Sequence, residues 1–279
     1  MQQTIDIHSS PVLKAKGEVV EKFTEIPACG RSFHLGEEPR GLNSSTTARI
    51  CQRLRGVHFY ATLYDQNGRI PIYSAYILEE STTSRPDISS SNWYLEPMLA
   101  GIEKPDMQQA STSLVQNNLE QFEESQAVNN DYRNSGFSRG HLNPSQHHSS
   151  EAQIATFTFT NMAPQESTLN SGSWNQYESF LRSSILPSCS EAYVVTGIIP
   201  SGTTPEEGVW IRGRVNVPSF FWSAFSCQLK NGEWHMEARL GRNARPYDVQ
   251  TKTVSELEEM LAAKFGENVT IFPGENSSK

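Results

Sequence analysis

The sequence has little charge and no excess of basic residues. Asp, Glu, Lys and Arg make up 19% of its 279 residues, below the roughly 25% typical of soluble domains. Lys and Arg number 23 against 31 for Asp and Glu, which gives a net charge of -8. A global positive field that recruits nucleic acid or an anionic membrane is therefore excluded, and any polyanionic partner must meet a local basic patch.

Long hydrophobic runs are also missing. No stretch approaches the ~18 consecutive apolar residues of a membrane helix, and residues 1–20 have neither an apolar core nor a cleavage-like motif. We therefore expect a soluble chain without membrane contact. We also expect that a signal peptide has been removed before this numbering begins. Three N-glycosylation sequons, at Asn43, Asn268 and Asn276, and a surface rich in neutral polar residues favour a secreted glycoprotein.

The four cysteines lack any CxxC spacing, which argues against a zinc ribbon or a thioredoxin-type redox pair. Cys29, Cys51, Cys189 and Cys227 form an even set that fits two disulfides, with four buried thiols as the alternative. Three pairings are possible. The most local one joins Cys29 to Cys51 and Cys189 to Cys227, and we expect this pairing.

Strand patterns outnumber helix patterns along the chain. The expected strands are 58–64 and 70–77 around an Asn-Gly turn, 155–160, 192–199, and 220–229 with 234–240 as a second hairpin. The expected helices are 108–121, 173–184 and 253–265. Between residues 79 and 131 the periodicity fails, and a long irregular excursion of this kind in a compact domain is often functional.

These elements predict one α+β domain, with a mixed or antiparallel sheet as its core and flanking helices. No linker with a shift in composition divides the chain, and no repeat of 20 to 50 residues is visible. We expect the domain to span residues 19–273, behind a loosely attached N-terminal extension, 1–18. A polar tail, 274–279, follows it.

One histidine has chemically suitable neighbours. In the segment 138–144 (SRGHLNP), Arg139, Gly140 and His141 place a permanent cation, a flexible residue and an imidazole together. A phosphodiester hydrolase needs an imidazole to accept a proton from water and a guanidinium to neutralise phosphate charge, with a divalent ion at the leaving oxygen. Taken alone, the cluster also fits a loop histidine bonded to backbone.

The residues that follow at fixed distance decide between these interpretations. The ordered set is Arg139-Gly140-His141, then Asn161, then Asn170-x-Gly172-x-Trp174-x-x-x-Glu178. The chain here resembles the DNA/RNA non-specific endonucleases with a ββα-metal site. The flanking segments 26–29, 51–76 and 92–97 are similar to the secreted animal branch of that family, the endonuclease domain-containing type.

The resemblance implies a role for each matching position. His141 is the expected general base and Arg139 an expected phosphate contact. Asn170 is the expected single protein ligand of a mostly water-coordinated Mg²⁺, for which Mn²⁺ substitutes, and Asn161 and Glu178 are supporting residues. Mg²⁺ dehydrates reluctantly and takes its remaining ligands from water and substrate phosphate, so one protein ligand is physically reasonable.

The expected substrate is DNA, RNA or both, bound through backbone phosphates, with little readout of bases and with 5′-phosphate ends in the product. Because the net charge is unfavourable, we expect Arg133, Arg182 and Arg212 to add phosphate contacts. Two positions depart from the family pattern. Ser138 replaces an Asp that is expected to orient Arg139, and Ser91 replaces an Arg of bacterial members. These departures support an alternative, a weakened or inactive secreted protein that binds nucleic acid or glycan.

Two other motifs predict different chemistry. Residues 136–140 (GFSRG) fit the G-x-S-x-G elbow of an α/β-hydrolase, but the apolar strand before Ser138 and the helix after it are missing. His147, His148 and Glu151 are a possible metal cluster, although a solvated polar loop explains them more simply. The sequence as a whole therefore favours a secreted, magnesium-dependent endonuclease.

Overall fold

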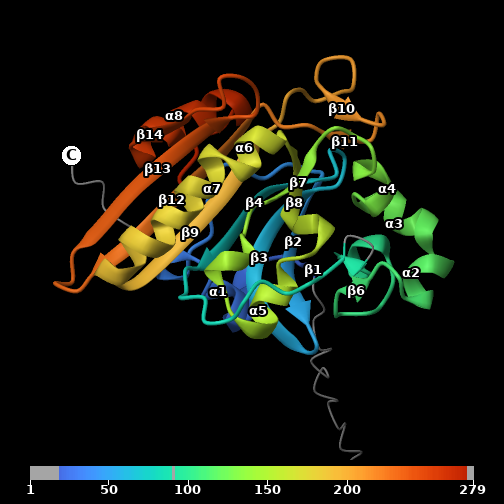
Figure 1. Cartoon of the computed structure of the whole chain (residues 1–279), viewed down its shortest axis with the longest axis horizontal. Helices are drawn as coiled ribbons and strands as arrows, with labels where there is room; N and C mark the ends of the chain where they lie inside the picture. The colour runs from blue at the N-terminus through green and yellow to red at the C-terminus, as the bar shows by residue number, and fades with distance from the viewer. Residues whose placement is uncertain (1–18, 90–91, 275–279) are drawn as a thin grey trace, which may run out of the picture.

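The computed structural model describes residues 19–89 and 92–274, and within these the largest element is an eight-stranded sheet (Figure 1). The strand order is β1-β2-β3-β4-β9-β12-β13-β14, and every neighbouring pair is antiparallel. The strands are β1 Val19–Val20, β2 Thr47–Leu54, β3 Val57–Asp65, β4 Ile70–Ile77, β9 Cys189–Ile199, β12 Phe220–Leu229, β13 Trp234–Arg242 and β14 Val249–Lys252. The predicted α+β class is confirmed.

Both predicted hairpins are present in the sheet. In the β3–β4 turn the carboxylate of Asp65 accepts the backbone N–H groups of Asn67, at 3.2 Å, and Gly68, at 3.0 Å. These bonds satisfy donors that a tight turn otherwise leaves to solvent. The second hairpin joins β12 to β13, with Gln228 opposite Trp234.

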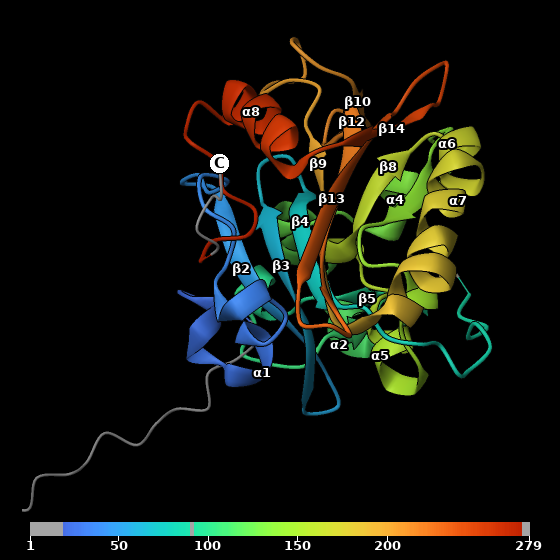
Figure 2. The same cartoon turned by 90° about the vertical axis from the view of Figure 1, so that its left-hand side faces the viewer.

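Helices cover both faces of the sheet. Figure 2 shows α6 (Ser167–Ser171) and α7 (Ser173–Phe180) on one face and α8 (Val254–Phe265) on the other. Helix α8 matches the predicted 253–265: Thr253 and Glu256 form a reciprocal capping box at its start, and Gly266 ends it in the left-handed conformation.

A second, two-stranded sheet lies on the α6–α7 side. Strand β7 (Ser138–His141) pairs antiparallel with β8 (Met162–Gln165), so that His141 lies opposite Met162, and α6 and α7 follow β8. In the sequence, helix α5 (Ser150–Ala155) lies between these two strands. The remaining short elements include α1 Pro27–Gly30, β5 Tyr94–Leu95, β6 Gln108–Gln109, α2 Ser113–Asn117, α3 Leu119–Ser125, α4 Asn129–Tyr132, β10 Trp210–Ile211 and β11 Val215–Asn216.

Two predicted elements differ in the structure. Residues 155–160 were expected to form a strand but contain the end of α5 and the start of a 3-10 turn, Phe159–Asn161. The strand prediction was wrong because it took the alternation of Phe and Thr as a sign of one buried and one exposed face. In the structure Phe157, Thr158, Phe159 and Thr160 are all buried. The single helix expected over 108–121 is replaced by β6, α2 and the first part of α3.

Two disulfides link sheet strands to their neighbours, and both have the expected local pairing. Cys29 in α1 is bonded to Cys51 in β2, and Cys189 at the start of β9 is bonded to Cys227 in β12. In the described part of the chain, no helix has the length and apolar character needed to cross a bilayer. The extension predicted for 1–18 and all but the first residue of the 274–279 tail lie outside the described residues.

Candidate active site

A hollow of about 460 Å³ lies where β7, the loop after it and helices α6 and α7 meet. It gathers four of the eight predicted site residues, Arg139, His141, Asn170 and Glu178, which come from β7, α6 and α7. Its lining residues are Arg85, Trp93, Ser138, Arg139, His141, Pro144, Ser145, Gln146, Asn170, Ser171, Asn175 and Glu178. We call this hollow the cleft.

His141 is the last residue of β7 and lies between two aromatic rings. Its ring centroid is 5.6 Å from that of Trp93 and 5.1 Å from that of Phe157. Burial, together with the positive charge of Arg85, lowers the pKa of His141 to about 3. Nε2 is buried without a hydrogen-bond partner among the described residues. The imidazole is therefore neutral at physiological pH, which is the form that accepts a proton.

Arg139 lies two residues before His141, on the same side of β7, because side chains alternate along a strand. Its guanidinium carbon is 5.0 Å from the ring centroid of Trp93, so this indole contacts both the arginine and the histidine. A guanidinium N–H donates to Oδ1 of Asn129 at 2.5 Å. Ser138 instead shares a hydrogen bond of 2.9 Å with Ser167. The side chain that bonds to Arg139 is therefore that of Asn129 and not that of Ser138.

Asn161 is fully buried behind the cleft and holds the loop that follows His141. Its Oδ1 accepts the backbone N–H of Asn143 at 3.0 Å, and its Nδ2 donates to the carbonyl of Asn143 at 2.9 Å. Its backbone carbonyl accepts the N–H of Leu142 at 3.0 Å. This arrangement makes Asn161 a support of the His141 loop rather than a group that faces substrate.

A chain of buried polar side chains continues from Asn161 through the sheet. Ser74 donates to Asn161 Oδ1 at 2.9 Å, and its hydroxyl lies 3.0 Å from that of Thr62. Gln52 Nε2 then donates to both Thr62, at 3.2 Å, and Thr160, at 2.9 Å. None of these hydrogen-bonded side chains is exposed.

This series of hydrogen-bonded side chains ends at the fully buried carboxyl group of Glu96. Oε1 of Glu96 accepts hydrogen bonds from Thr158 at 2.7 Å and from Thr160 at 2.9 Å, while Oε2 has no partner among the described residues. Burial raises the pKa of Glu96 to about 7, and the two threonine hydroxyls oppose this rise. Glu96 lies in the segment 92–97, but nothing in its local sequence connects it to His141, which is far away in the chain.

Asn170 and Glu178 reach the cleft from two different helices. Asn170 lies in α6 and Glu178 in α7, and the backbone turns between them at Gly172, which has φ −102° and ψ −113°. A Cβ at Gly172 would lie 2.4 Å from the carbonyl oxygen of Thr168, so only glycine fits. The two side chains therefore belong to two separate helical segments and not to one continuous helical face.

Glu178 lines the cleft, and its carboxyl group is largely removed from solvent. Burial raises its pKa to about 8, and the charge of Arg85 and a hydrogen bond from Trp174 oppose the rise. The backbone carbonyl of Glu178 is 3.0 Å from Nε2 of His147, whose Nδ1 is 3.0 Å from the hydroxyl of Tyr76. His147 is therefore engaged in positioning α7, not in the metal cluster considered from the sequence.

The groups that face the cleft are suitable for a hard divalent cation. Asn170 offers an amide oxygen that forms no hydrogen bond with the described residues, and the buried Glu178 carboxyl lacks a cationic partner in direct contact. Oxygen donors with open positions for water suit Mg²⁺. Among the described residues, no group of three or more His, Cys, Asp or Glu side chains forms a full metal cage. A cation here must therefore take most of its ligands from water and substrate.

Arg85 is a cleft residue that the sequence did not reveal. It lies in the irregular segment after β4, and its guanidinium carbon is 5.6 Å from the ring centroid of Phe157. Hydrogen bonds to the start of α5 hold this segment: Thr82 N–H donates to Ser149 at 2.7 Å, and Ser150 N–H donates to Thr83 at 3.0 Å. No motif marks Arg85, since only the tertiary fold brings it to His141.

The three arginines predicted to bind substrate are outside the lining of the cleft. Arg133 and Arg212 are exposed neighbours, because a guanidinium N–H of Arg212 donates to the carbonyl of Arg133 at 2.9 Å. Arg133 follows α4, the helix that begins with Asn129. Arg182 is partly exposed beyond the end of α7, and its charge lowers the pKa of His147.

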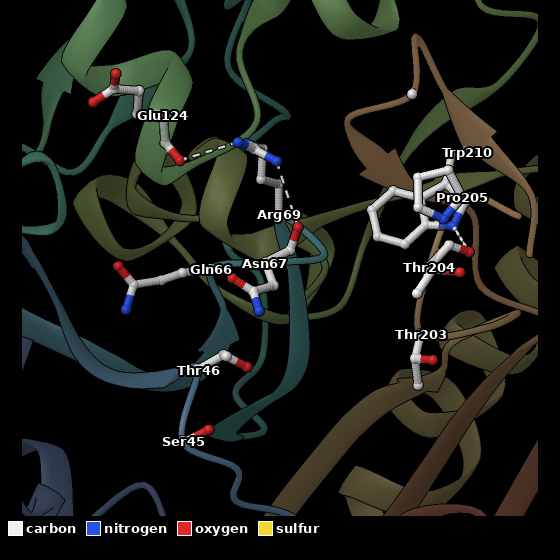
Figure 3. Close-up of a pocket in the computed structure, with 11 residues that line it drawn as sticks. Ser45, Thr46, Gln66, Asn67, Arg69, Glu124, Thr203, Thr204, Pro205 and Trp210 are labelled. Carbon is white, nitrogen blue, oxygen red and sulfur yellow. Dashed lines mark hydrogen bonds between the residues drawn. The ribbon is translucent and has the colours of Figure 1, made fainter. Parts of the chain in front are cut away.

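A second hollow, of about 600 Å³, lies at the far end of β3 and is shown in Figure 3. Its arginine, Arg69, donates to the backbone carbonyls of Glu123, Glu124 and Arg214 at 3.0 to 3.2 Å. Its indole, Trp210, donates to the carbonyl of Thr204 at 2.8 Å. Because these donors are already used within the protein, they are not available to a ligand in the second hollow.

A β7–β8 pair followed by a helix, with a histidine at the end of β7 and an Asn and a Glu beyond β8, is the ββα arrangement of a class of nucleases. The sequence agrees with this class. The profile of the DNA/RNA non-specific endonucleases matches residues 39–272, and the chain belongs to that family.

Individual relatives give the same result. The human endonuclease domain-containing 1 protein is 29% identical over 247 residues, which cover 87% of this chain and 47% of that protein. Human mitochondrial endonuclease G is 34% identical over 127 residues, 42% of each chain. The chain spans about half the length of the curated relatives it matches first.

The fold also matches a solved structure. A crystal structure of the EndoG/EndoGI complex aligns with a TM-score of 0.57 at 22% identity, covering 84% of this chain and 89% of that one. At this level of identity the match supports the fold.

Proposed function

We propose that this chain is a divalent-metal-dependent endonuclease that hydrolyses phosphodiester bonds of DNA, RNA or both, with His141 as its general base. The observation that carries the proposal is the neutral imidazole of His141, held by two aromatic rings in a cleft that also contains Arg85, Arg139 and Asn170. The relatives' names supply the reaction class, and the cleft supplies groups that perform it.

The proposed reaction begins with water beside His141. The imidazole accepts a proton from the water as its oxygen attacks phosphorus, and the guanidinium groups of Arg139 and Arg85 hold the phosphate oxygens while negative charge increases. Asn170 is the proposed protein ligand of a Mg²⁺ ion, with Mn²⁺ as a substitute, and the ion supplies charge neutralisation at the leaving oxygen. The 3′-oxygen leaves, so the products carry 5′-phosphates.

Supporting residues maintain this geometry. Asn161 fixes the loop after His141 through the backbone of Asn143. Glu178, on α7 beyond the Gly172 turn that follows Asn170, would act on the ion through water. Arg133 and Arg212, next to α4, extend the positive surface for neighbouring phosphates, and Arg182 does so beyond α7.

The proposed compartment is extracellular. Two disulfides persist where the environment is oxidising. The sequon residues Asn43 and Asn268 are both exposed, and the backbone ladder between Arg40 and Thr270 brings their segments together. Asn276 lies outside the described residues.

A plasmid assay tests the function. Purified chain is incubated with supercoiled DNA in Mg²⁺, in Mn²⁺ and in EDTA, and separately with a structured RNA. Nicked and linear products in the metal samples alone, with ends that a ligase joins without prior phosphorylation, support the proposal. Binding of nucleic acid without cleavage under all conditions supports the inactive binding protein instead.

A further inference from the structure

The guanidinium of Arg139 lies in a cage that contains no acidic group. Its carbon is 5.0 Å from the ring centroid of Trp93, 5.5 Å from that of Tyr132 and 5.9 Å from that of Phe159. The fourth member is Asn129, whose Oδ1 accepts an N–H at 2.5 Å. Within the described ranges 19–89 and 92–274, no carboxylate forms an ion pair with Arg139.

The acidic residue of the same helix is directed elsewhere. Asp131 is two residues from Asn129 in α4, and it is buried. Its Oδ1 accepts from Arg214 Nε at 2.9 Å, and its Oδ2 accepts the backbone N–H of Val128 at 2.9 Å. Its charge is therefore compensated by Arg214 and is not shared with Arg139.

An amide oxygen and a carboxylate orient a guanidinium in similar ways, but only the carboxylate cancels its charge. Aromatic faces likewise attract the cation without neutralising it. In a chain of net charge −8, a cleft arginine paired with a carboxylate would offer little attraction to a phosphate. The identity of the side chain at position 129 therefore controls how much positive charge the cleft presents.

We propose that Asn129 is a positioning residue that fixes the direction of the Arg139 guanidinium while leaving its positive charge free for a substrate phosphate. This inference rests on the proposed function, because it takes nucleic-acid phosphate as the ligand of Arg139. It predicts that Asn129→Asp, which keeps the size of the side chain but adds a negative charge, weakens DNA binding more than Asn129→Ala, which removes the amide.

Binding measured as a function of salt tests the inference. The probe is a fluorescein-labelled 20-base-pair DNA duplex. Binding is measured by fluorescence anisotropy in EDTA, in titrations at KCl concentrations from 25 to 200 mM. A gel confirms that the duplex stays intact. The variants are Asn129→Asp, Asn129→Ala and Arg139→Ala. The matched control is Asn130→Asp, which adds the same charge at the exposed neighbouring residue.

Arg139→Ala and Asn129→Asp are each expected to weaken binding on the order of tenfold and to reduce the slope of log K against log salt by about 0.9, the value for one phosphate contact. Asn130→Asp and Asn129→Ala are expected to keep the wild-type slope. Asn129→Ala is expected to lower kcat in Mg²⁺, because the guanidinium loses its direction. The double variant Asn129→Asp/Arg139→Ala is expected to show no further loss of slope.

An Asn129→Asp slope equal to that of wild type overturns the inference, and so does an Asn130→Asp slope as low as that of Asn129→Asp. If Asn129→Asp does not fold by circular dichroism, Asn129→Ala decides: wild-type kcat overturns the inference, and lower kcat at an unchanged slope supports it. A wild-type chain that neither binds nor cleaves nucleic acid overturns the proposed function itself, which is a distinguishable result.

Discussion

The side chain of Asn161 pairs with both backbone groups of Asn143, as one strand of a sheet pairs with its neighbour. The N–H of Asn143 donates to Oδ1 at 3.0 Å, and Nδ2 donates back to the Asn143 carbonyl at 2.9 Å. Two backbone groups two residues beyond His141 are thus fixed by one amide. The position of His141 therefore depends on a buried side chain that never contacts the cleft's contents.

Replacing His141 by Ala is expected to reduce kcat by ~10²–10⁴, the usual contribution of a general base. The fold should persist, since the imidazole's Nε2 forms no hydrogen bond with the described residues. Steady-state cleavage and thermal melting measure the two effects, with His235→Ala at an exposed position of β13 as the control. Wild-type turnover in the His141 variant would show that another group is the base.

The pH dependence of kcat should lack an inflection near 6.5. The pKa of His141 is lowered to about 3, so the neutral imidazole persists as the pH falls from 8 to 5, and the base is not lost over that range. The measurement is kcat at saturating metal between pH 5 and 8, in buffers of constant ionic strength. A decline centred at pH 6.5 that disappears in His141→Ala would contradict the burial seen here.

Asn170→Ala is expected to nearly abolish cleavage at unchanged melting temperature. Asn170 caps neither helix, since it lies inside α6 and the N-cap of α7 is Gly172, so its loss should not unwind a helix start. Glu178→Ala should cost about 10–100-fold, as for a residue that acts on a metal through its ligands, and raised Mg²⁺ or Mn²⁺ should restore part of the activity. Ser171→Ala, at the cleft edge, is the control. A melting temperature that falls while turnover stays normal would remove Asn170 from the site.

Arg85→Ala is expected to lower kcat/KM by roughly 10–100-fold, because a charge-assisted contact to phosphate contributes about 1.5–3 kcal/mol. Arg85→Lys should recover part of this loss, since it keeps the charge but not the planar fork. Arg31→Ala, exposed just after α1, is the control for lost positive charge. Equal effects of the Arg85 and Arg31 variants would show a general charge effect rather than a contact in the cleft.

Glu96→Gln is expected to change how stability depends on pH. The folded-state pKa of Glu96 is raised from 4.5 to about 7, so the stability linked to its protonated form is complete below pH 4.5 and is lost as the pH rises through 7. Because glutamine does not titrate, the Glu96→Gln variant does not lose stability in this way as the pH rises. Its free energy of unfolding relative to wild type should therefore increase between pH 4.5 and 8, by roughly 3 kcal/mol at most. Urea unfolding at several pH values measures the difference, and a constant difference would contradict a buried, titrating carboxyl.

Local sequence signals predicted the parts of the site that depend on neighbours in the chain. The turn around Gly68 and the helix that starts after Thr253 each follow from short-range rules, and the structure contains both. The strand that ends at His141 was not among the strands predicted from periodicity. The two disulfides likewise have the pairing that closes the shortest loops.

Tertiary contacts decided the rest. Thr158 and Thr160 alternate with Phe as in a half-buried strand, yet their hydroxyls face inward to the carboxyl of Glu96. Arg85 and Asn129 are two unremarkable polar residues in sequence, and only the packed fold places them beside His141 and Arg139. Periodicity cannot reveal such contacts, because it reports one face of one element at a time.

Arg85 comes from the segment after β4, whereas His141, Asn170 and Glu178 come from the β7–β8 pair and its helices. The segment is tied to α5 by a few hydroxyl contacts and contributes no strand to the large sheet. The two arginines of the cleft, Arg85 and Arg139, are therefore encoded in separate stretches of the gene. Substitutions or length changes near Arg85 would alter one of the two cationic groups while leaving the β7–β8 pair and its helices unchanged.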